Sequence, residues 1–256
     1  MAMIRCDFFA ESLALSTSMT VLLPQPSDGQ IGVAGRASDD PPPVLYLLHG
    51  LTDDDTAWTR FTSIERYAAA KGIAVVMPQV HRSFYADERY GGRFWTFLSE
   101  ELPEVVQRFF RVSDRRADTV VAGLSMGGYG AFKWALRQPE RFAAAASLSG
   151  ALDVAYIQRH DRRPHMRGLT ARVFADRVVA GSDDDLLHLV ATVTDPATLP
   201  RLLLRCGTED HLVAQNERFI RACAEHGVAL DSAFGPGAHE WGYWDTEVQT
   251  VLDWLA

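Results

Sequence analysis

The stretch that decides the fold is Val120-Val121-Ala122-Gly123-Leu124-Ser125-Met126-Gly127-Gly128-Tyr129-Gly130-Ala131. A short β-branched and apolar run leads into Gly-x-Ser-x-Gly, and an apolar pattern typical of a helix follows. Side chains at 123 and 127 would collide with the neighbouring strand and helix, so glycine fits best at both positions. The spacing therefore predicts that Ser125 stands at a tight strand–helix turn, beside a helix N-terminus that favours negative charge.

Apolar strands alternate with helices on both sides of this turn. We expect helices at 56–71, 97–110, 126–137, 214–226 and 244–255, and strands at 20–23, 44–48, 73–77, 119–122, 143–148, 202–206 and 229–234. Continuous apolar strands separated by helices predict an α/β fold, with a mostly parallel central sheet flanked by helices on both faces. Such sheets place their functional sites at the carboxyl ends of the strands.

The length of 256 residues suits one α/β domain that spans 1–256. Residues 24–43 are rich in Pro, Gly, Ser and Asp and predict a surface loop, which follows an N-terminal hairpin region. Residues 151–200 interrupt the alternation of strands and helices. We expect them to form a small cap-like insertion over the site, and a solvated surface excursion is the alternative.

Composition excludes several classes of partner. The net charge of −8, without a basic stripe, argues against nucleic acid and anionic membranes. No apolar run approaches the ~18 residues of a membrane helix, and the N-terminus has no apolar signal core. The three cysteines, Cys6, Cys206 and Cys223, are scattered and lack metal-ligand spacing. We therefore expect a cytoplasmic protein with reduced thiols and no metal site.

Acyl transfer by a serine requires a histidine base and an acid that orients it. In folds with this turn, the acid follows the serine in the chain and the histidine follows the acid. The predicted strand 202–206 runs into Gly207-Thr208-Glu209-Asp210, so Asp210 is the predicted acid. Asp153, after the preceding strand, is the competitor, and Asp210 could instead cap the next helix. His239 lies in a glycine-containing loop after the last predicted strand and is the predicted base.

The oxyanion that forms during acyl transfer needs two backbone N–H donors. One comes from the residue after the nucleophile, Met126. The other comes from a loop after an early strand, which in this chain is Leu48-His49-Gly50-Leu51-Thr52. We nominate the N–H of Leu51 as the second donor and expect His49 to be a buried scaffold group rather than a proton carrier.

The run from Gly123 to Ala131 resembles the esterase D and S-formylglutathione hydrolase family of α/β-hydrolases, and within it the bacterial tributyrin esterases are most alike. Supporting matches extend over nearly the whole chain and include Leu47-Leu48-His49-Gly50, Val75-Val76-Met77-Pro78 and Glu100-Glu101-Leu102-Pro103. The resemblance implies a serine carboxylesterase for small acyl groups, without a cofactor and often a homo-oligomer. The family's triad pattern carries over to Ser125, Asp210 and His239.

One departure concerns specificity. S-formylglutathione hydrolases have a cysteine just after the oxyanion-loop Leu-Thr, where this chain has Asp53-Asp54-Asp55. We therefore expect a small-molecule acyl ester substrate, acetyl to butyryl, hydrolysed through an acyl-enzyme. A thioesterase for S-formylglutathione, an acyltransferase or an acetylated-sugar deacetylase could use the same triad, and a catalytically inert binding module is a further alternative. Aromatic side chains of the segment 81–95, among them Phe84, Tyr85 and Trp95, either wall the substrate pocket or pack as loop core. Trp58 and Trp241 are further candidates for the pocket.

Overall fold

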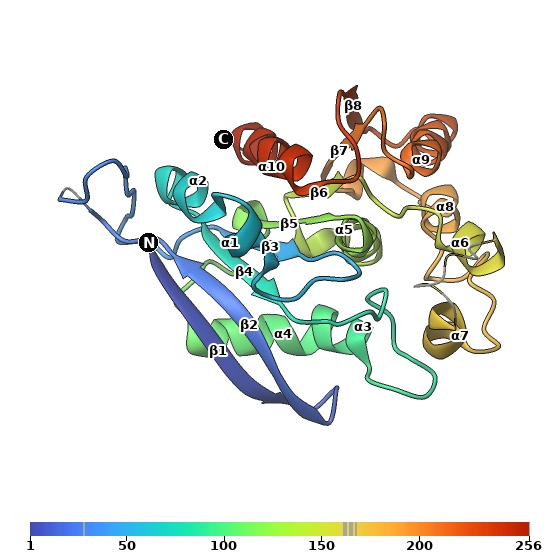
Figure 1. The fold of residues 1–256 in the computed structure, drawn as a ribbon, viewed down its shortest axis with the longest axis horizontal. Coiled ribbons are helices and arrows are strands. Elements are labelled where there is room, and N and C mark those ends of the chain that lie inside the picture. Colours follow the sequence, from blue (N-terminus) through green and yellow to red (C-terminus); the bar gives the residue numbers. More distant parts are fainter. Residues whose placement is uncertain (28, 161–162, 164–165, 167, 256) are drawn as a thin grey trace.

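One eight-stranded sheet forms the centre of the computed structural model (Figure 1), which describes residues 1–27, 29–160, 163, 166 and 168–255. The strand order is β1-β2-β4-β3-β5-β6-β7-β8, and only the pairs β1–β2 and β2–β4 are antiparallel. The predicted mostly parallel sheet is therefore confirmed. The strands are β1 (Ala2–Ala10), β2 (Leu15–Leu23), β3 (Val44–Leu48), β4 (Ala74–Pro78), β5 (Thr119–Leu124), β6 (Ala144–Leu148), β7 (Arg201–Gly207) and β8 (Asp231–Gly235).

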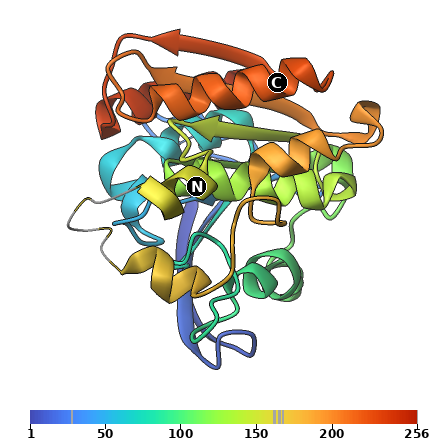
Figure 2. The same cartoon turned by 90° about the vertical axis from the view of Figure 1, so that its right-hand side faces the viewer.

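Helices cover both faces of the sheet, as predicted. Side chains alternate between the two faces along each strand, so the continuous apolar strands make both faces apolar, and both must be covered. In β3, Tyr46 packs into one core cluster, and its neighbours Leu45 and Leu47 pack into the other. The first cluster lies under α4 (Leu102–Phe109), α5 (Met126–Arg137) and α9 (Val213–Glu225). The second lies under α1 (Ala57–Phe61), α2 (Ile64–Lys71) and α10 (Trp241–Leu255), so α5 and α10 are on opposite sides of the sheet (Figure 2).

Two helices predicted as continuous are interrupted, for local reasons. The predicted helix 56–71 is divided into α1 and α2 because Thr62 is extended and its hydroxyl accepts a hydrogen bond from the N–H of Ile64. The predicted helix 97–110 begins as α3 (Phe94–Thr96), widens into a π-helical turn at Phe97–Glu101 and continues as α4. The π turn ends two residues before Pro103, which has no N–H to donate to the carbonyl four residues earlier, that of Ser99.

Strand β1 was not predicted individually, although a hairpin region was expected at the N-terminus. Its side chains alternate between exposed and half-buried, so it lacks the continuous apolar run of the central strands. Each of its nine residues is paired with β2, from Ala2 opposite Leu23 to Ala10 opposite Leu15. The described residues of 24–43 form the predicted loop, apart from an isolated bridge between Ser27 and Gly35.

The segment 151–200 forms α6 (Val154–His160), α7 (Leu169–Phe174) and α8 (Leu186–Ala191) and adds no strand to the sheet among its described residues. Residues 161–162, 164–165 and 167 of the predicted cap lie outside the described residues. The fully buried side chain of Lys133 on α5 links this segment to the core. Its ammonium donates to the Tyr85 carbonyl at 2.7 Å and to the Asp184 carboxylate. Among the helices described here, none has the length and apolar character needed to cross a bilayer.

Candidate active site

Ser125 stands between the end of β5 and the start of α5 in a strained backbone conformation. Its φ of 54° and ψ of −115° are unusual for a residue with a Cβ atom. Hydrogen bonds fix this conformation from both sides. The Ser125 N–H donates to the Leu148 carbonyl at 2.9 Å, and its carbonyl accepts from Ala151 N–H at 3.0 Å. The sheet and the chain after β6 therefore hold the turn, and the half-buried serine lines a pocket.

The glycines around the turn are required by close backbone contacts. A Cβ at Gly127 would lie 2.3 Å from the carbonyl oxygen of Leu48, and one at Gly123 would lie 2.5 Å from the backbone of Gly127. Backbone atoms of β3 and α5 cannot move aside as a flexible side chain could. The steric reason for Gly-x-Ser-x-Gly is therefore as predicted from the sequence.

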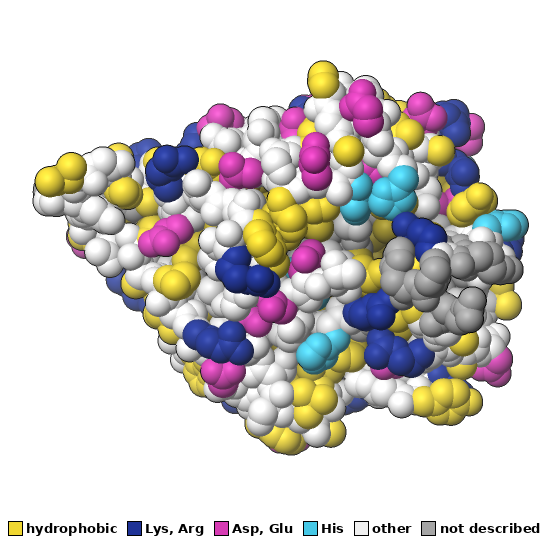
Figure 3. All heavy atoms as spheres, in the orientation of Figure 1, with side chains coloured by type: hydrophobic (Ala, Val, Ile, Leu, Met, Phe, Trp, Pro, Cys, Tyr) yellow, Lys and Arg dark blue, Asp and Glu magenta, His cyan; other side chains and the backbone are white. Residues whose placement is uncertain are grey.

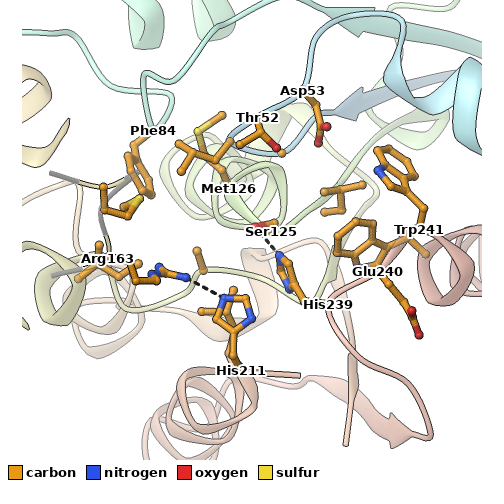
Figure 4. Close-up of a pocket in the computed structure, with 18 residues that line it drawn as sticks. Thr52, Asp53, Phe84, Ser125, Met126, Arg163, His211, His239, Glu240 and Trp241 are labelled. Atoms are coloured by element: carbon orange, nitrogen blue, oxygen red, sulfur yellow. Dashed lines mark hydrogen bonds between the residues drawn. The ribbon is translucent and has the colours of Figure 1, made fainter. Parts of the chain in front are cut away.

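The side chains of Ser125, His239 and Asp210 form a continuous hydrogen-bonded chain (Figure 4 shows its first link). His239 Nε2 lies 3.0 Å from Ser125 Oγ, and His239 Nδ1 lies 2.8 Å from Asp210 Oδ2. An ionised carboxylate only accepts hydrogen bonds, so Nδ1 carries the imidazole proton and Nε2 can accept the serine proton. The structure thus brings together the three residues predicted from strand ends, although Ser125 and His239 are 114 residues apart in the chain.

Asp210 is almost completely buried, and it is ionised by its partners. Burial alone would raise the pKa of this carboxyl, but the hydrogen bond and charge of His239 and the N–H of Leu212 outweigh burial, so the pKa lies below its usual value. Leu212 N–H donates to Oδ1 at 2.8 Å, so Asp210 also makes the local backbone contact expected of a capping residue. The competitor Asp153 instead pairs with Arg218.

The loop after β3 brings Leu51 to the pocket, opposite Met126 at the N-terminus of α5. Within the described part of the chain, neither backbone N–H donates a hydrogen bond to another residue. Both are therefore available to an oxyanion. His49 is buried as expected: its Nδ1 contacts the Gly50 carbonyl at 2.7 Å, and its Nε2 accepts from Val80 N–H at 3.1 Å. Burial lowers the pKa of His49, which holds the loop as a neutral group.

A cavity of about 560 Å³ opens over Ser125. On the molecular face in Figure 3, histidine and charged side chains border an apolar hollow near the centre. The residues predicted from the sequence that line the cavity are Leu51, Ser125, Met126, His239 and Trp241. Gly50 and Thr52 also line it and belong to the predicted oxyanion loop, and Phe84 belongs to the aromatic segment 81–95. The lining residues that sequence reasoning did not assign to the site are Asp53, Leu124, Ala151, Ile157, Arg163, Met166, His211, Leu212, Glu240 and Trp244.

Three of the predicted pocket aromatics do not line the cavity, and the structure corrects their assignment. Trp58 is buried behind the wall, where its indole N–H donates to the Leu48 carbonyl at 3.2 Å and its ring packs edge-on against Trp241. Tyr85 is buried, and its hydroxyl donates to the His49 carbonyl at 2.8 Å. Trp95 packs under the cationic group of Lys133. These aromatic side chains support the loops instead, because their large apolar surfaces are more stable in the core.

Position along the chain gave a signal for some of the missed residues. Asp53 directly follows the predicted oxyanion loop, and His211 directly follows the predicted acid. Ile157, Arg163 and Met166 come from the segment 151–200, where no periodic pattern indicates which side chains turn inward.

Comparison with known proteins agrees with this geometry. The family model named Esterase matches residues 11–255. The chain belongs to the Esterase family of α/β-hydrolases. This esterase is a serine hydrolase of the carboxylesterase class, as the motif around Ser125 predicted.

Relatives of the esterase extend over the whole chain. It is 27% identical over 263 residues to an acetyl esterase from Caldicellulosiruptor saccharolyticus, which covers 100% of this chain and 98% of that relative. FphF, a fluorophosphonate-binding serine hydrolase of Staphylococcus aureus solved with substrate bound, is 31% identical with a TM-score of 0.88. The S-formylglutathione hydrolase FrmB of the same organism is 31% identical with a TM-score of 0.85. Each of these two matches covers 99% of this chain and 98% of the other.

One group of side chains in the esterase could also hold a metal ion. Asp210, His211 and His239 each offer a ligand atom, and these atoms lie within 4.8 Å of one another. The rings of His211 and His239 meet edge-on at 4.6 Å. Imidazole and carboxylate suit a borderline divalent ion such as Zn²⁺. Because two of the three donors belong to the hydrogen-bonded chain from Ser125, an ion bound here would compete with proton transfer by His239.

Proposed function

We propose that this esterase hydrolyses short-chain acyl esters, acetyl to butyryl, through an acyl-enzyme on Ser125. The single observation that carries the proposal is the chain of hydrogen bonds from Ser125 Oγ through His239 to the buried Asp210, in which Ser125 and His239 line the cavity. The acetyl esterase from Caldicellulosiruptor saccharolyticus, similar over the full length, supports a small acyl group.

In the first half-reaction, Ser125 Oγ attacks the ester carbonyl carbon as His239 Nε2 takes the hydroxyl proton. The negative charge that develops on the carbonyl oxygen is stabilised by the N–H groups of Leu51 and Met126. His239 then gives its proton to the leaving alcohol oxygen, and the C–O bond of the ester breaks. Asp210 keeps the imidazole in the required tautomer and stabilises its positive charge.

In the second half-reaction, water takes the place of the alcohol. His239 Nε2 accepts a proton from the water as its oxygen attacks the acyl carbon. The same two N–H groups hold the oxyanion, and the proton returns to Ser125 Oγ as the carboxylic acid leaves. No cofactor takes part in this scheme.

The preference for short chains follows from the cavity walls. Phe84, Ile157 and Met166 line the cavity and are themselves almost fully buried. A wall with packed atoms behind it resists displacement by a longer acyl chain. Two of these residues come from the segment 151–200, which we propose acts as a cap over a single domain.

A chain-length series of p-nitrophenyl esters tests the proposal. We expect the highest kcat/KM between C2 and C4, and no turnover for Ser125→Ala, with the exposed Ser38→Ala as the matched control. A fluorophosphonate probe should label the wild type and not Ser125→Ala. A maximum at C8 or longer would contradict the short-chain preference, and persistent turnover by Ser125→Ala would contradict the nucleophile.

A second candidate is thioester hydrolysis, which the 31% identity to the S-formylglutathione hydrolase FrmB favours. Asp53 lines the cavity and opposes it, because a carboxylate repels an anionic leaving group such as glutathione. Acyl transfer and deacetylation of sugars would use the same acyl-enzyme. Adding S-formylglutathione and an acetylated oligosaccharide to the ester panel, with and without an acceptor alcohol, separates these reactions.

A further inference from the structure

Three consecutive carbonyl groups at the end of β3 each contact a buried ring that can donate a hydrogen bond. The indole N–H of Trp58 donates to the Leu48 carbonyl at 3.2 Å. The Tyr85 hydroxyl donates to the His49 carbonyl at 2.8 Å, and Nδ1 of His49 lies 2.7 Å from the Gly50 carbonyl oxygen. The three side chains are at most 1% exposed. The backbone that leads into the oxyanion loop is therefore held from the core side.

The contact on Gly50 sets the direction of the proposed oxyanion donor. Nε2 of His49 accepts the Val80 N–H, so the proton of the neutral ring is on Nδ1, which donates to the Gly50 carbonyl. The N–H of Leu51 belongs to the same peptide group as this carbonyl, and in a trans peptide the two bonds point in opposite directions. With the carbonyl directed at the buried imidazole, the N–H is directed away from it. Leu51 lines the cavity, so we expect its N–H to face the reacting carbonyl.

The Tyr85 hydroxyl holds the preceding peptide group, which joins His49 to Gly50. Glycine has no Cβ to restrict its backbone, so the chain at Gly50 can rotate unless the peptide groups on both sides of it are held. One hydrogen bond on each side supplies that restraint. Loss of either bond would allow the Leu51 N–H to turn away from the oxyanion.

Tyr85 reaches the loop from a strained stretch of backbone. Phe84 and Tyr85 are consecutive and almost fully buried, and their φ angles of 50° and 49° lie in the left-handed region that bulky residues rarely adopt. The Tyr85 N–H donates to Ser83 Oγ at 3.1 Å, and its carbonyl accepts from the buried Lys133 ammonium at 2.7 Å. Gly130 on α5 leaves room for the ring, since a Cβ there would lie 2.5 Å from Tyr85 Cδ2. Strain of this kind persists where several contacts hold it, and it is concentrated at functional sites.

We propose that Tyr85 is a positioning residue of this esterase, whose hydroxyl acts together with His49 to aim the Leu51 N–H at the oxyanion. The inference rests on the proposed function, because it requires an oxyanion to form on an ester attacked by Ser125. Tyr85 does not line the cavity and acts through the loop alone. Burial raises the pKa of its hydroxyl well above the usual value, so the hydroxyl keeps the proton that it donates.

Tyr85→Phe tests the proposal, with Tyr129→Phe as the matched control. Both tyrosines are fully buried, and each hydroxyl donates to a main-chain carbonyl at 2.8 Å, that of His49 for Tyr85 and that of Asp184 for Tyr129. Each variant keeps its ring and loses one buried hydrogen bond, so the two should lose similar thermal stability. With p-nitrophenyl acetate, kcat should fall about tenfold or more in Tyr85→Phe, with KM within about twofold of wild type, because the oxyanion exists only in the transition state. In Tyr129→Phe, kcat should stay within about threefold of wild type.

A transition-state analogue separates a misdirected N–H from general damage. Ser125 Oγ adds to the carbonyl carbon of a trifluoromethyl ketone while His239 takes the hydroxyl proton, and the adduct carries the oxyanion with no leaving group. Its Ki should rise in Tyr85→Phe by the factor by which kcat/KM falls, and should not change in Tyr129→Phe. A folded Tyr85→Phe that keeps wild-type kcat, or that loses kcat at an unchanged Ki, would overturn the proposal. Wild-type turnover that disappears in Ser125→Ala supports the proposed function whichever result is found, so the two can fail separately.

Two variants of His49 provide a second measurement that leaves Tyr85 in place. Both His49→Asn and His49→Leu lose the acceptor for the Val80 N–H. The asparagine NH₂ group is bonded to Cγ, as Nδ1 is, and can still donate to the Gly50 carbonyl, which leucine cannot. His49→Asn should therefore keep a kcat about tenfold or more above that of His49→Leu, and the lower Ki for the ketone. Equal kcat in the two folded variants would rule out the restraint at Gly50 as the source of the N–H direction.

Discussion

Replacing Asp210 with Asn tests the proposed role of the acid most directly, because the structure fixes how the new amide must point. Oδ1 of Asp210 accepts the Leu212 N–H at 2.8 Å, and Oδ2 faces His239 Nδ1 at 2.8 Å. In Asp210→Asn the amide oxygen stays with the Leu212 N–H, since the NH₂ group cannot accept a hydrogen bond. The NH₂ group therefore faces His239, whose Nδ1 must then lose its proton and accept.

The proton moves to Nε2 of His239, which now donates to Ser125 Oγ and cannot take its proton. The same tautomer error in a serine protease lowers kcat about 10⁴-fold, which corresponds to about 5.5 kcal/mol of transition-state stabilisation. We expect a loss of that size here, with little change in KM, because Asp210 is 2% exposed and does not line the cavity.

The assay is steady-state hydrolysis of p-nitrophenyl acetate at pH 7.5, with thermal unfolding as the measure of folding. Glu209→Gln is the matched control: this neighbouring carboxylate accepts the Gly237 N–H and makes no contact with His239 among the described residues. Its kcat should stay within about threefold of wild type. A folded Asp210→Asn variant that keeps more than a tenth of wild-type kcat would refute the assignment of Asp210.

Four further predictions concern the core, the turn and the site. Lys133→Met should lower the free energy of unfolding by about 3 kcal/mol in a denaturant titration, since it leaves the mostly buried Asp184 carboxylate without the ammonium that pairs with it. The pKa of Asp184 is lowered: burial would raise it, but the charge of Lys133 outweighs burial. A lowered carboxyl pKa stabilises the fold above pH ~4, and this contribution disappears as pH falls below it, so Asp184→Asn should flatten that part of the stability–pH curve. Gly127→Ala should abolish activity and lower the melting temperature, because its Cβ would lie 2.3 Å from the Leu48 carbonyl oxygen. Zn²⁺ should inhibit the wild type, and His211→Asn should raise the inhibitory concentration about tenfold or more while retaining ester hydrolysis.

Control variants separate these effects from general damage. Lys71→Met removes a lysine whose partner, Asp253, is exposed, and it should change the free energy of unfolding by less than about 1 kcal/mol. His188→Asn removes a histidine outside the metal-donor group and should leave the Zn²⁺ response unchanged. Equal inhibition of wild type and His211→Asn would contradict a site that includes His211.

The sheet apart from β1, the turn at Ser125 and the candidate triad could all be predicted from the order of residues along the chain. Apolar strands and glycine positions are local signals, since each follows from backbone hydrogen bonding and sterics within a few residues. Parallel strands bring their carboxyl ends to one edge, so Asp210 and His239 could be predicted from strand ends alone. The steric need for Gly123 and Gly127 followed from the same local geometry.

Which side chains form the pocket wall could not be predicted in this way, because it depends on tertiary contacts. Trp58, Tyr85 and Trp95 have the chemistry of a binding pocket, but they lie behind the cavity and support its loops. Ile157 and Met166, from a segment without a periodic pattern, line it instead. Side-chain direction in loops depends on contacts between segments distant in the chain, and those contacts leave no local signature in the sequence.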